Sequence, residues 1–456
     1  MNTSAATRRA TRLAPLIAAL SILVWQGPVT AQAASGAGIV STGSSPVIVL
    51  LNDNVDPSAK LAQYGIVAKH VYAHGVLGFS AALTVAQQAT LAGDPDVAMV
   101  APDRKRSYSA NATPAAPVRG IALEGAITGA KPTGTTPIEQ VPQIAARGFR
   151  RIGGLSMKTV TVDNHDDRIN ADIAILDSGI QPDQPDLRVA GGVDCADNTG
   201  NWADVEGHGT IVGGIAAAKD NSFGIVGVAA GARLWSVRVL DSNLEGEDSA
   251  IICGIEWVTA HSATIDVANM SLGGPGSDDG HCGRLNNDPV HFAICQSVKT
   301  GVVYIASAGN DSIDVKDVIP AAYSEVITVS GISDSDGAPG GQGGPDPCEG
   351  MADDSFASFS NFGRRVDIAA PAVCIASTYI GSDVAVDSGT SFAAPFVTGA
   401  AAVYIASHRG KIELSRDAGQ QRTEDVRREI IARRERGHIA GDPDGFDEGV
   451  LNVAGF

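Results

Sequence analysis

The sequence predicts an α/β fold, a parallel sheet sandwiched by helices, preceded by a smaller α+β unit of the ferredoxin-like type. The first observation is that apolar strands alternate with helices from about residue 138 onward. The second is that strands such as 171–177 run into continuous apolar stretches, as strands covered on both faces do. The third is a βαββαβ order over 46–106. A chain of 456 residues has room for both units.

Residues 1–33 have the pattern of a secretory signal peptide. Three arginines within 8–12 precede an apolar stretch at 13–25, and the small-residue pattern "AQA" follows at 31–33. An uncleaved anchor is the alternative, but the apolar stretch is too short to span a bilayer as a helix. We therefore expect a secreted protein, extracellular or in the cell envelope, with no stable membrane anchor.

The smaller unit is assigned to 34–106. Its expected elements are strand 46–51, helix 56–65, strands 66–73 and 78–84, helix 85–95 and strand 97–102. Residues 107–137 are rich in Ala, Pro, Gly, Ser and Thr and have little periodicity. We expect them to form an exposed linker of the kind that proteases cut.

The larger unit is assigned to 138–456. Its expected strands are 171–177, 232–240, 265–274, 302–310 and 326–332. Its expected helices are 208–218, 249–260, 293–301 and 391–407. A charge-laced amphipathic helix at 424–441 is expected to cover the core.

Composition narrows the class of protein. The net charge of −18 argues against binding to a nucleic-acid backbone and favours a soluble monomer. Six cysteines fit an oxidising compartment. Cys282 and Cys295 are the nearest local pair, although His281 and His291 between and beside them leave a zinc site as the alternative. The other expected pairs, which the sequence leaves open, are Cys348 with Cys374 and Cys195 with Cys253.

Polar residues lie where ligands of parallel sheets bind, at the ends of strands and at a helix start. Asp177 and Asn310 each end a predicted strand, and His208 stands between glycines at a helix start. Ser391 begins the helix 391–407 and has two interpretations, a helix cap or a nucleophile. Serine becomes a good nucleophile only beside a base, which needs an orienting carboxylate, and the reacting carbonyl oxygen needs amide donors. These four residue types together predict acyl transfer.

The motifs around these residues carry a resemblance. They are "DSG" at 177–179, "GHGT" at 207–210, "SAGN" at 307–310 and "GTSFAAP" at 389–395. In this order they resemble the subtilase family of serine proteases, and the similarity covers about 138–456. The resemblance implies a serine endopeptidase in which the nucleophile, base, orienting acid and oxyanion donor are Ser391, His208, Asp177 and Asn310. Residues 46–106 resemble the family's inhibitory propeptide, which implies a self-processed zymogen that matures within 107–137.

The same resemblance implies a substrate cleft. Its pocket-lining residues would be Ser271, Leu272, Gly273, Gly274, Ser307, Ala308 and Gly309. An edge strand near 241–248 would pair with an extended peptide. Val318 would lie near the pocket floor and favour a small residue before the scissile bond.

A structural calcium site is also implied. Asp186 and Asn221 match side-chain ligands, and Glu139 replaces a glutamine as an oxygen donor. The complete expected set is Glu139, Asp186, Lys219, Asn221, Phe223 and Ile225. An ordinary Asx turn with surface acids is the alternative.

Two other functions remain open at this point. A catalytically silent exported protein could use the same cleft to bind peptides. A dedicated processing protease with one physiological protein substrate would keep the catalytic residues but show poor general proteolysis.

Overall fold

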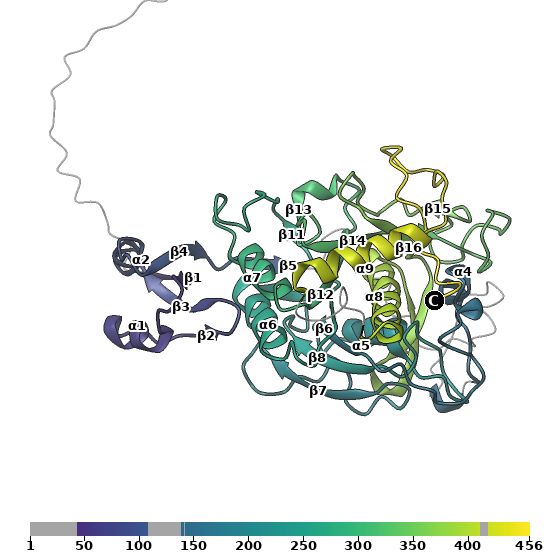
Figure 1. Cartoon of the computed structure of the whole chain (residues 1–456), viewed down its shortest axis with the longest axis horizontal. Coiled ribbons are helices and arrows are strands. Elements are labelled where there is room, and N and C mark those ends of the chain that lie inside the picture. The colour runs from purple at the N-terminus through teal and green to yellow at the C-terminus, as the bar shows by residue number, and fades with distance from the viewer. Residues whose placement is uncertain (1–42, 108–137, 141, 411–417) are drawn as a thin grey trace, which may run out of the picture. The chain divides into compact units, whose positions relative to one another are not determined.

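The computed structural model describes residues 43–107, 138–140, 142–410 and 418–456 (Figure 1). Its central sheet has the strand order β15-β14-β12-β10-β6-β8-β7, and β16 also pairs with β14. Every pairing in this sheet is parallel except that of β14 with β15. The strands are β6 Asp172–Asp177, β7 Val189–Asp194, β8 Arg233–Arg238, β10 Val267–Met270, β12 Val303–Ser307, β14 Val326–Ser333, β15 Ser355–Phe356 and β16 Ile368–Pro371. The predicted parallel α/β sheet is confirmed.

Helices cover both faces of the sheet because side chains alternate along its strands. On β6, Ile173 and Ile175 pack with residues of two helices, and Ala174 and Leu176 pack with residues of two others. The first pair of helices is α5 His208–Ala217 and α8 Thr390–Ser407, and the second is α6 Asp248–Ala260 and α7 Pro289–Val298. The helix α9 Gln420–Arg433 lies beside α8 (Figure 1) and buries Val426 and Ile430 in the core, as its amphipathic pattern predicts, but it ends at Arg433 and not at the expected residue 441.

The small unit is a four-stranded antiparallel sheet with two helices. Its strand order is β2-β3-β1-β4. Its elements are β1 Ser44–Leu51, α1 Pro57–Tyr64, β2 His70–Ala73, β3 Leu77–Thr84, α2 Val85–Ala92 and β4 Val97–Pro102. Asp56 caps α1, and Thr84 forms a capping box with Gln87 on α2. The predicted βαββαβ order is confirmed.

Several elements differ from the prediction. The strand expected at 66–73 begins only at His70, because Gly65, with φ 61°, ends α1 and Ile66 N–H bonds back to the Leu61 carbonyl. The strand β7 was not predicted, since its Gly-rich sequence "VAGGVD" has little strand character. The remaining short elements are η1 Ile138–Gln140, α4 Arg147–Arg151, η2 Gly154–Ser156, β11 Gly274–Pro275, η3 Val315–Asp317, β13 Val318–Ile319, β17 Ile375–Tyr379, η4 Ile380–Ser382 and β18 Asp383–Asp387.

Three disulfides join the cysteines, Cys195–Cys253, Cys282–Cys295 and Cys348–Cys374. The expected pairing is confirmed. A zinc site that uses the Cys282 and Cys295 thiolates is therefore ruled out, because both sulfurs are in a disulfide.

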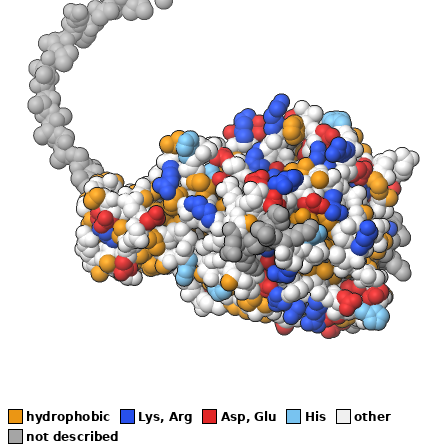
Figure 2. Space-filling model, viewed as in Figure 1, with side chains coloured by type: hydrophobic (Ala, Val, Ile, Leu, Met, Phe, Trp, Pro, Cys, Tyr) orange, Lys and Arg blue, Asp and Glu red, His pale blue; other side chains and the backbone are white. Residues whose placement is uncertain are grey.

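The expected signal peptide at 1–33 and nearly all of the expected linker, 108–137, lie outside the described residues. The helix α8 is long and apolar enough to cross a membrane, but 89% of that stretch is buried inside the protein. On the face shown in Figure 2, Lys and Arg side chains are interspersed with Asp and Glu side chains.

Candidate active site

Asp177 and His208 form the first pair of the site. The wholly buried strand β6 ends at Asp177, and α5 begins at His208. His208 Nδ1 lies 2.8 Å from Asp177 Oδ1, and both side chains are buried. Because a carboxylate only accepts, Nδ1 carries the proton in this contact, which orients the ring. Gly207, with φ 121°, packs so closely on Tyr379 that an added Cβ would lie 2.1 Å from the ring.

The carboxylates around His208 raise its pKa. Burial by itself lowers the pKa of the ring, but the charge and hydrogen bond of Asp177, together with the charges of Glu206 and Asp387, raise the pKa of His208 to about 9. The ring is therefore a stronger base than a free imidazole, and it must be unprotonated before it can accept a proton from serine.

Ser391 lies in the first turn of α8, as predicted, but it is not the cap. The N-cap residue is Gly389, and no side chain caps this helix. Ser391 is 1% exposed, and its Oγ has no hydrogen-bond partner among the described residues. The ring of the next residue, Phe392, lies 5.4 Å from the ring of His208. A buried hydroxyl without a partner is costly in a purely structural role, so the cap interpretation of Ser391 is wrong.

Asn310 follows β12, and its amide is held in one orientation. Its Oδ1 accepts hydrogen bonds from the Thr390 backbone N–H and the Thr390 hydroxyl, both at 2.8 Å. The amide nitrogen is therefore the end left to donate, and a Cβ added to Gly389 would lie 3.6 Å from it. This places an N–H donor beside the start of α8.

The residues expected to line the specificity pocket follow two neighbouring parallel strands. After β10 come Ser271, Leu272, Gly273 and Gly274, and at the end of β12 lie Ser307, Ala308 and Gly309. Val318 lies between the two segments, since its Cγ1 would be 3.5 Å from a Cβ on Gly273 and 3.6 Å from one on Gly309.

The edge expected to bind an extended peptide pairs with the chain itself. The strand β9 Glu245–Glu247 is antiparallel to β5 Lys105–Ser107, with Gly246 opposite Arg106. The expected edge lay at 241–248, and its occupant is the segment just after the small unit. The sequence predicted the edge, and the resemblance implied an inhibitory propeptide, but neither identified β5 as the strand that pairs there.

Arg106 inserts its side chain beside Asp248. Its Nε lies 2.7 Å from Asp248 Oδ1 and its Nη2 lies 3.0 Å from Oδ2, so the contact is bidentate. Nη1 donates to the Pro275 carbonyl at 2.6 Å. The two charged side chains are only 7% and 1% exposed. Apolar residues line this pocket, including Ile251, Met270, Leu272, Val290 and Ile319.

Glu256 on α6 is a further contact that sequence reasoning missed. Its carboxylate accepts four backbone N–H groups of the small unit, from Ala73, His74, Gly75 and Val76, at 2.7–2.9 Å. In the sequence "GIEWV" it looks like any polar residue on a helix, so no local signal could have revealed this role.

Five of the expected calcium ligands lie in contact with one another, whereas Glu139 is at the surface. Asp186 is fully buried and accepts from Asn221 Nδ2 at 2.7 Å and from the Ile225 N–H at 3.0 Å. Burial raises the pKa of Asp186 to about 7. The Lys219 N–H donates to the Asp186 carbonyl, whereas Glu139 in η1 is exposed. Phe223 donates its N–H to Asn221 Oδ1.

Comparison with known proteins identifies relatives of this chain. Subtilisin NAT from Bacillus subtilis subsp. natto is 37% identical over 243 residues, which are 52% of this chain and 56% of that protein. Subtilisin from Bacillus pumilus is 36% identical over 243 residues, which are 52% of this chain and 78% of that protein. The crystal structure of a cold adapted subtilisin-like serine proteinase matches with a TM-score of 0.50 and 25% identity, covering 68% of this chain and 96% of that one.

Two family models match the sequence. The peptidase inhibitor I9 model matches residues 48–109, which include most of the small unit and β5. The subtilase model matches residues 169–453, more than half of the chain. The alignment spans about half the length of the first of the relatives above. The match over the main unit, which contains Asp177, His208, Asn310 and Ser391 in the arrangement described, means that the chain belongs to the subtilase family.

Proposed function

We propose that this protein is a secreted serine endopeptidase, made as a zymogen that removes its own N-terminal part. The observation that carries the proposal is the buried Asp177–His208 hydrogen bond in a site where the Ser391 hydroxyl is buried without a hydrogen-bond partner among the described residues. Export is supported by the signal-like 1–33 segment and the three disulfides.

The proposed reaction is acyl transfer. His208 removes the proton from Ser391 Oγ as that oxygen bonds to the substrate carbonyl carbon, and Asp177 stabilises the imidazolium that forms. Asn310 Nδ2 and the Ser391 N–H donate to the oxygen that becomes negative. His208 then gives its proton to the leaving amine, and water, activated by His208, releases the acyl group and regenerates Ser391.

Two incubations of the purified protein separate this function from the two alternatives. The purified protein is incubated with casein and, separately, with a serine-directed phosphonate. A peptidase cleaves casein and is labelled on Ser391, and a dedicated processing protease is labelled but cleaves casein poorly. The silent peptide binder would not cleave casein, would not be labelled and would keep its N-terminal part.

The strand β5 supports the view that the small unit inhibits the enzyme before maturation. It occupies the β9 edge, where an extended substrate would pair, and Glu256 holds the small unit against α6.

Substrates are expected to follow the path of β5, which makes Asp248 a determinant of specificity. In a peptide library, the wild-type enzyme should prefer arginine at the position that lies opposite Gly246, because Asp248 pairs with a guanidinium there. Asp248→Asn should lower this preference by about 30-fold, since it removes one charge of a buried pair. Glu245→Gln, a change to a more exposed neighbour, should leave the preference at this position intact. Identical profiles for Asp248→Asn and wild type would rule out this role.

The residue before the scissile bond is expected to be small, because Val318 occupies space between the two pocket-lining segments. Val318→Gly should raise kcat/KM for substrates with a large aromatic residue there by about 10-fold or more. Cleavage after alanine serves as the reference. A wild-type enzyme that already prefers large aromatic residues contradicts this expectation.

A structural calcium ion is proposed beside Asp186. The residues present fit such an ion. Asp186 is a fully buried carboxylate whose pKa burial raises to about 7, and the groups that donate to it, from Asn221 and Ile225, are uncharged N–H groups. Asp186 and nearby carbonyls would supply oxygen ligands, Asn221 would join them once its side chain turned its oxygen from the Phe223 N–H to the ion, and Glu139 would close the site from the surface. The ion would neutralise the buried charge and tie together the loops that contain these residues.

Removal of this ion should destabilise the protein. A chelator is expected to lower the Tm by about 5 °C or more in differential scanning calorimetry, because a ligand that binds only the folded state stabilises it. Asp186→Asn should have a lower Tm that calcium no longer raises. Equal Tm values of the wild type with chelator and with excess calcium would speak against the site.

A further inference from the structure

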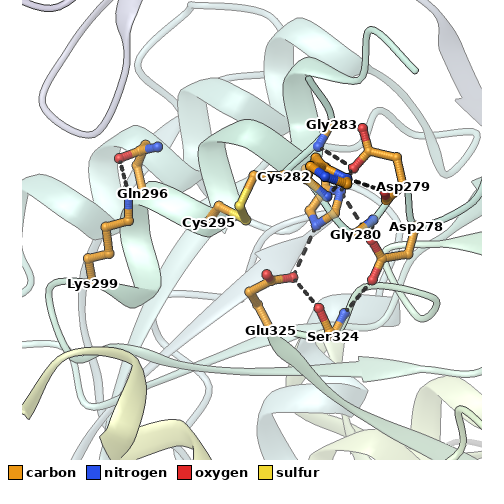
Figure 3. Close-up of a disulfide and its surroundings, with 12 residues drawn as sticks. Asp278, Asp279, Gly280, Cys282, Gly283, Cys295, Gln296, Lys299, Ser324 and Glu325 are labelled. Carbon is orange, nitrogen blue, oxygen red and sulfur yellow. Dashed lines mark hydrogen bonds and ion pairs between the residues drawn. A yellow bond between two sulfur atoms is a disulfide. The ribbon is translucent and has the colours of Figure 1, made fainter. Parts of the chain in front are cut away.

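A second cluster of potential metal ligands lies far along the sequence from the expected calcium ligands. His291 on α7 is fully buried, and its Nδ1 lies 3.8 Å from Asp278 Oδ1 and 3.8 Å from Asp279 Oδ1. These three atoms lie within 4.8 Å of one another. Figure 3 shows both aspartates on the loop beside the Cys282–Cys295 disulfide, with Glu325 nearby.

In its neutral form, His291 has a lone pair that faces the two aspartates. Nε2 lies 3.0 Å from Glu325 Oε2, and since a carboxylate oxygen only accepts, the single N–H of a neutral ring is on Nε2. Nδ1 then presents its lone pair to two anionic oxygens. Nδ1 has no hydrogen-bond partner among the described residues. A proton on Nδ1 would form ion pairs with both aspartates, but 3.8 Å is too long for a hydrogen bond to either.

A cation between the three atoms would pair with the Nδ1 lone pair and with the charges of both aspartates. Bonds from zinc to an imidazole nitrogen and to a carboxylate oxygen are each about 2.0–2.2 Å, so an ion fits between atoms that are 3.8 Å apart. We propose that Asp278, Asp279 and His291 bind a divalent transition-metal ion of the zinc class. The imidazole favours zinc over calcium, which takes oxygen ligands.

Neighbouring groups hold two of the three ligands in place, as the outer residues of a metal site do. A metal-bound histidine commonly donates its other N–H to a carboxylate, the role that Glu325 has here. Asp279 is held in place by the N–H groups of His281 and Gly283 on Oδ1 and by those of Leu285 and Asn286 on Oδ2.

Two further features fix the ligands and open the site to solvent. The Cys282–Cys295 disulfide ties the aspartate loop to α7, one turn after His291. The Asp278 side chain is 21% exposed, which gives an ion access from solvent.

The test uses the full chain with Ser391→Ala, so that the protein does not digest itself. The chain is treated with chelator, saturated with calcium and titrated with Zn²⁺ by calorimetry, and with Co²⁺ by visible absorption. We expect one Zn²⁺ per chain, a higher Tm on binding, and d–d bands from Co²⁺ that Zn²⁺ abolishes. These readouts do not depend on peptidase activity, so they stand apart from the proposed function.

Variants assign the binding to these residues. Asp278→Asn, a conservative change at the most exposed ligand, should weaken Zn²⁺ binding by at least 10- to 100-fold. Glu325→Gln should weaken it by about 10-fold or more through the orientation of His291. The control His281→Ala, which removes an exposed histidine of the same loop, should bind as the parent does. No saturable binding to the parent, unchanged affinity in Asp278→Asn, or loss of binding in His281→Ala would each overturn the proposal.

Discussion

Replacing Ser391 with alanine is expected to lower kcat on a peptide substrate by about 10⁶-fold, a magnitude carried over from subtilisin itself. The reason is that the variant loses the atom that forms the acyl bond, while the Asp177–His208 pair remains. Since the variant is not expected to mature itself, it is processed by tagged wild-type enzyme that is then removed, and its steady-state rate is measured.

The matched control for Ser391 is Ser407→Ala at the other end of α8. Among the described residues, Ser407 Oγ forms hydrogen bonds within its own helix and with its neighbour His408, so this variant should keep wild-type kcat. If Ser391→Ala retained a tenth of the wild-type rate, another group would have to be the nucleophile.

Asp177→Asn is expected to lower kcat by about 10⁴-fold with little change in folding, again a magnitude known from serine proteases. An amide in place of the carboxylate neither fixes the Nδ1–H tautomer nor stabilises the imidazolium. Its surface neighbour Asp183 gives the control Asp183→Asn, which should be fully active. Activity of Asp177→Asn within 10-fold of wild type contradicts the assigned role.

The pH profile of the same pair gives an independent readout. The base must be unprotonated, so wild-type activity should rise with pH as His208, with a pKa of about 9, loses its proton. Asp177 is the largest of the influences that raise this pKa, so its loss should lower the pKa and move the rising limb of Asp177→Asn to lower pH. An unshifted limb would mean that the profile reports a different group.

The sequence predicted the site better than it predicted the contacts around the site. Asp177 and Asn310 follow apolar strands, and His208 and Ser391 begin helices, so local patterns placed each of them correctly. Topology then brings these elements together, because the ends of parallel strands lie along one edge. Only the structure could exclude the cap interpretation of Ser391, since a helix cap and a buried hydroxyl without a partner among the described residues look alike in sequence.

Contacts between distant segments were beyond prediction from sequence. Arg106 and Asp248 are 142 positions apart, and the backbone groups that Glu256 binds are at least 180 positions away. Nothing in the local sequence marks either pairing, because it depends on how the two units pack. The βαββαβ order of the small unit, by contrast, follows from local periodicity and capping residues such as Thr84.

The most direct test of the account is the mass and N-terminus of the expressed protein. Wild type and Ser391→Ala are produced in parallel, and each is analysed by intact mass spectrometry and N-terminal sequencing. We predict that wild type begins within 107–137, whereas Ser391→Ala retains the small unit. The same cleavage in both proteins, or no cleavage in wild type, would contradict a self-processing serine peptidase with Ser391 as its nucleophile.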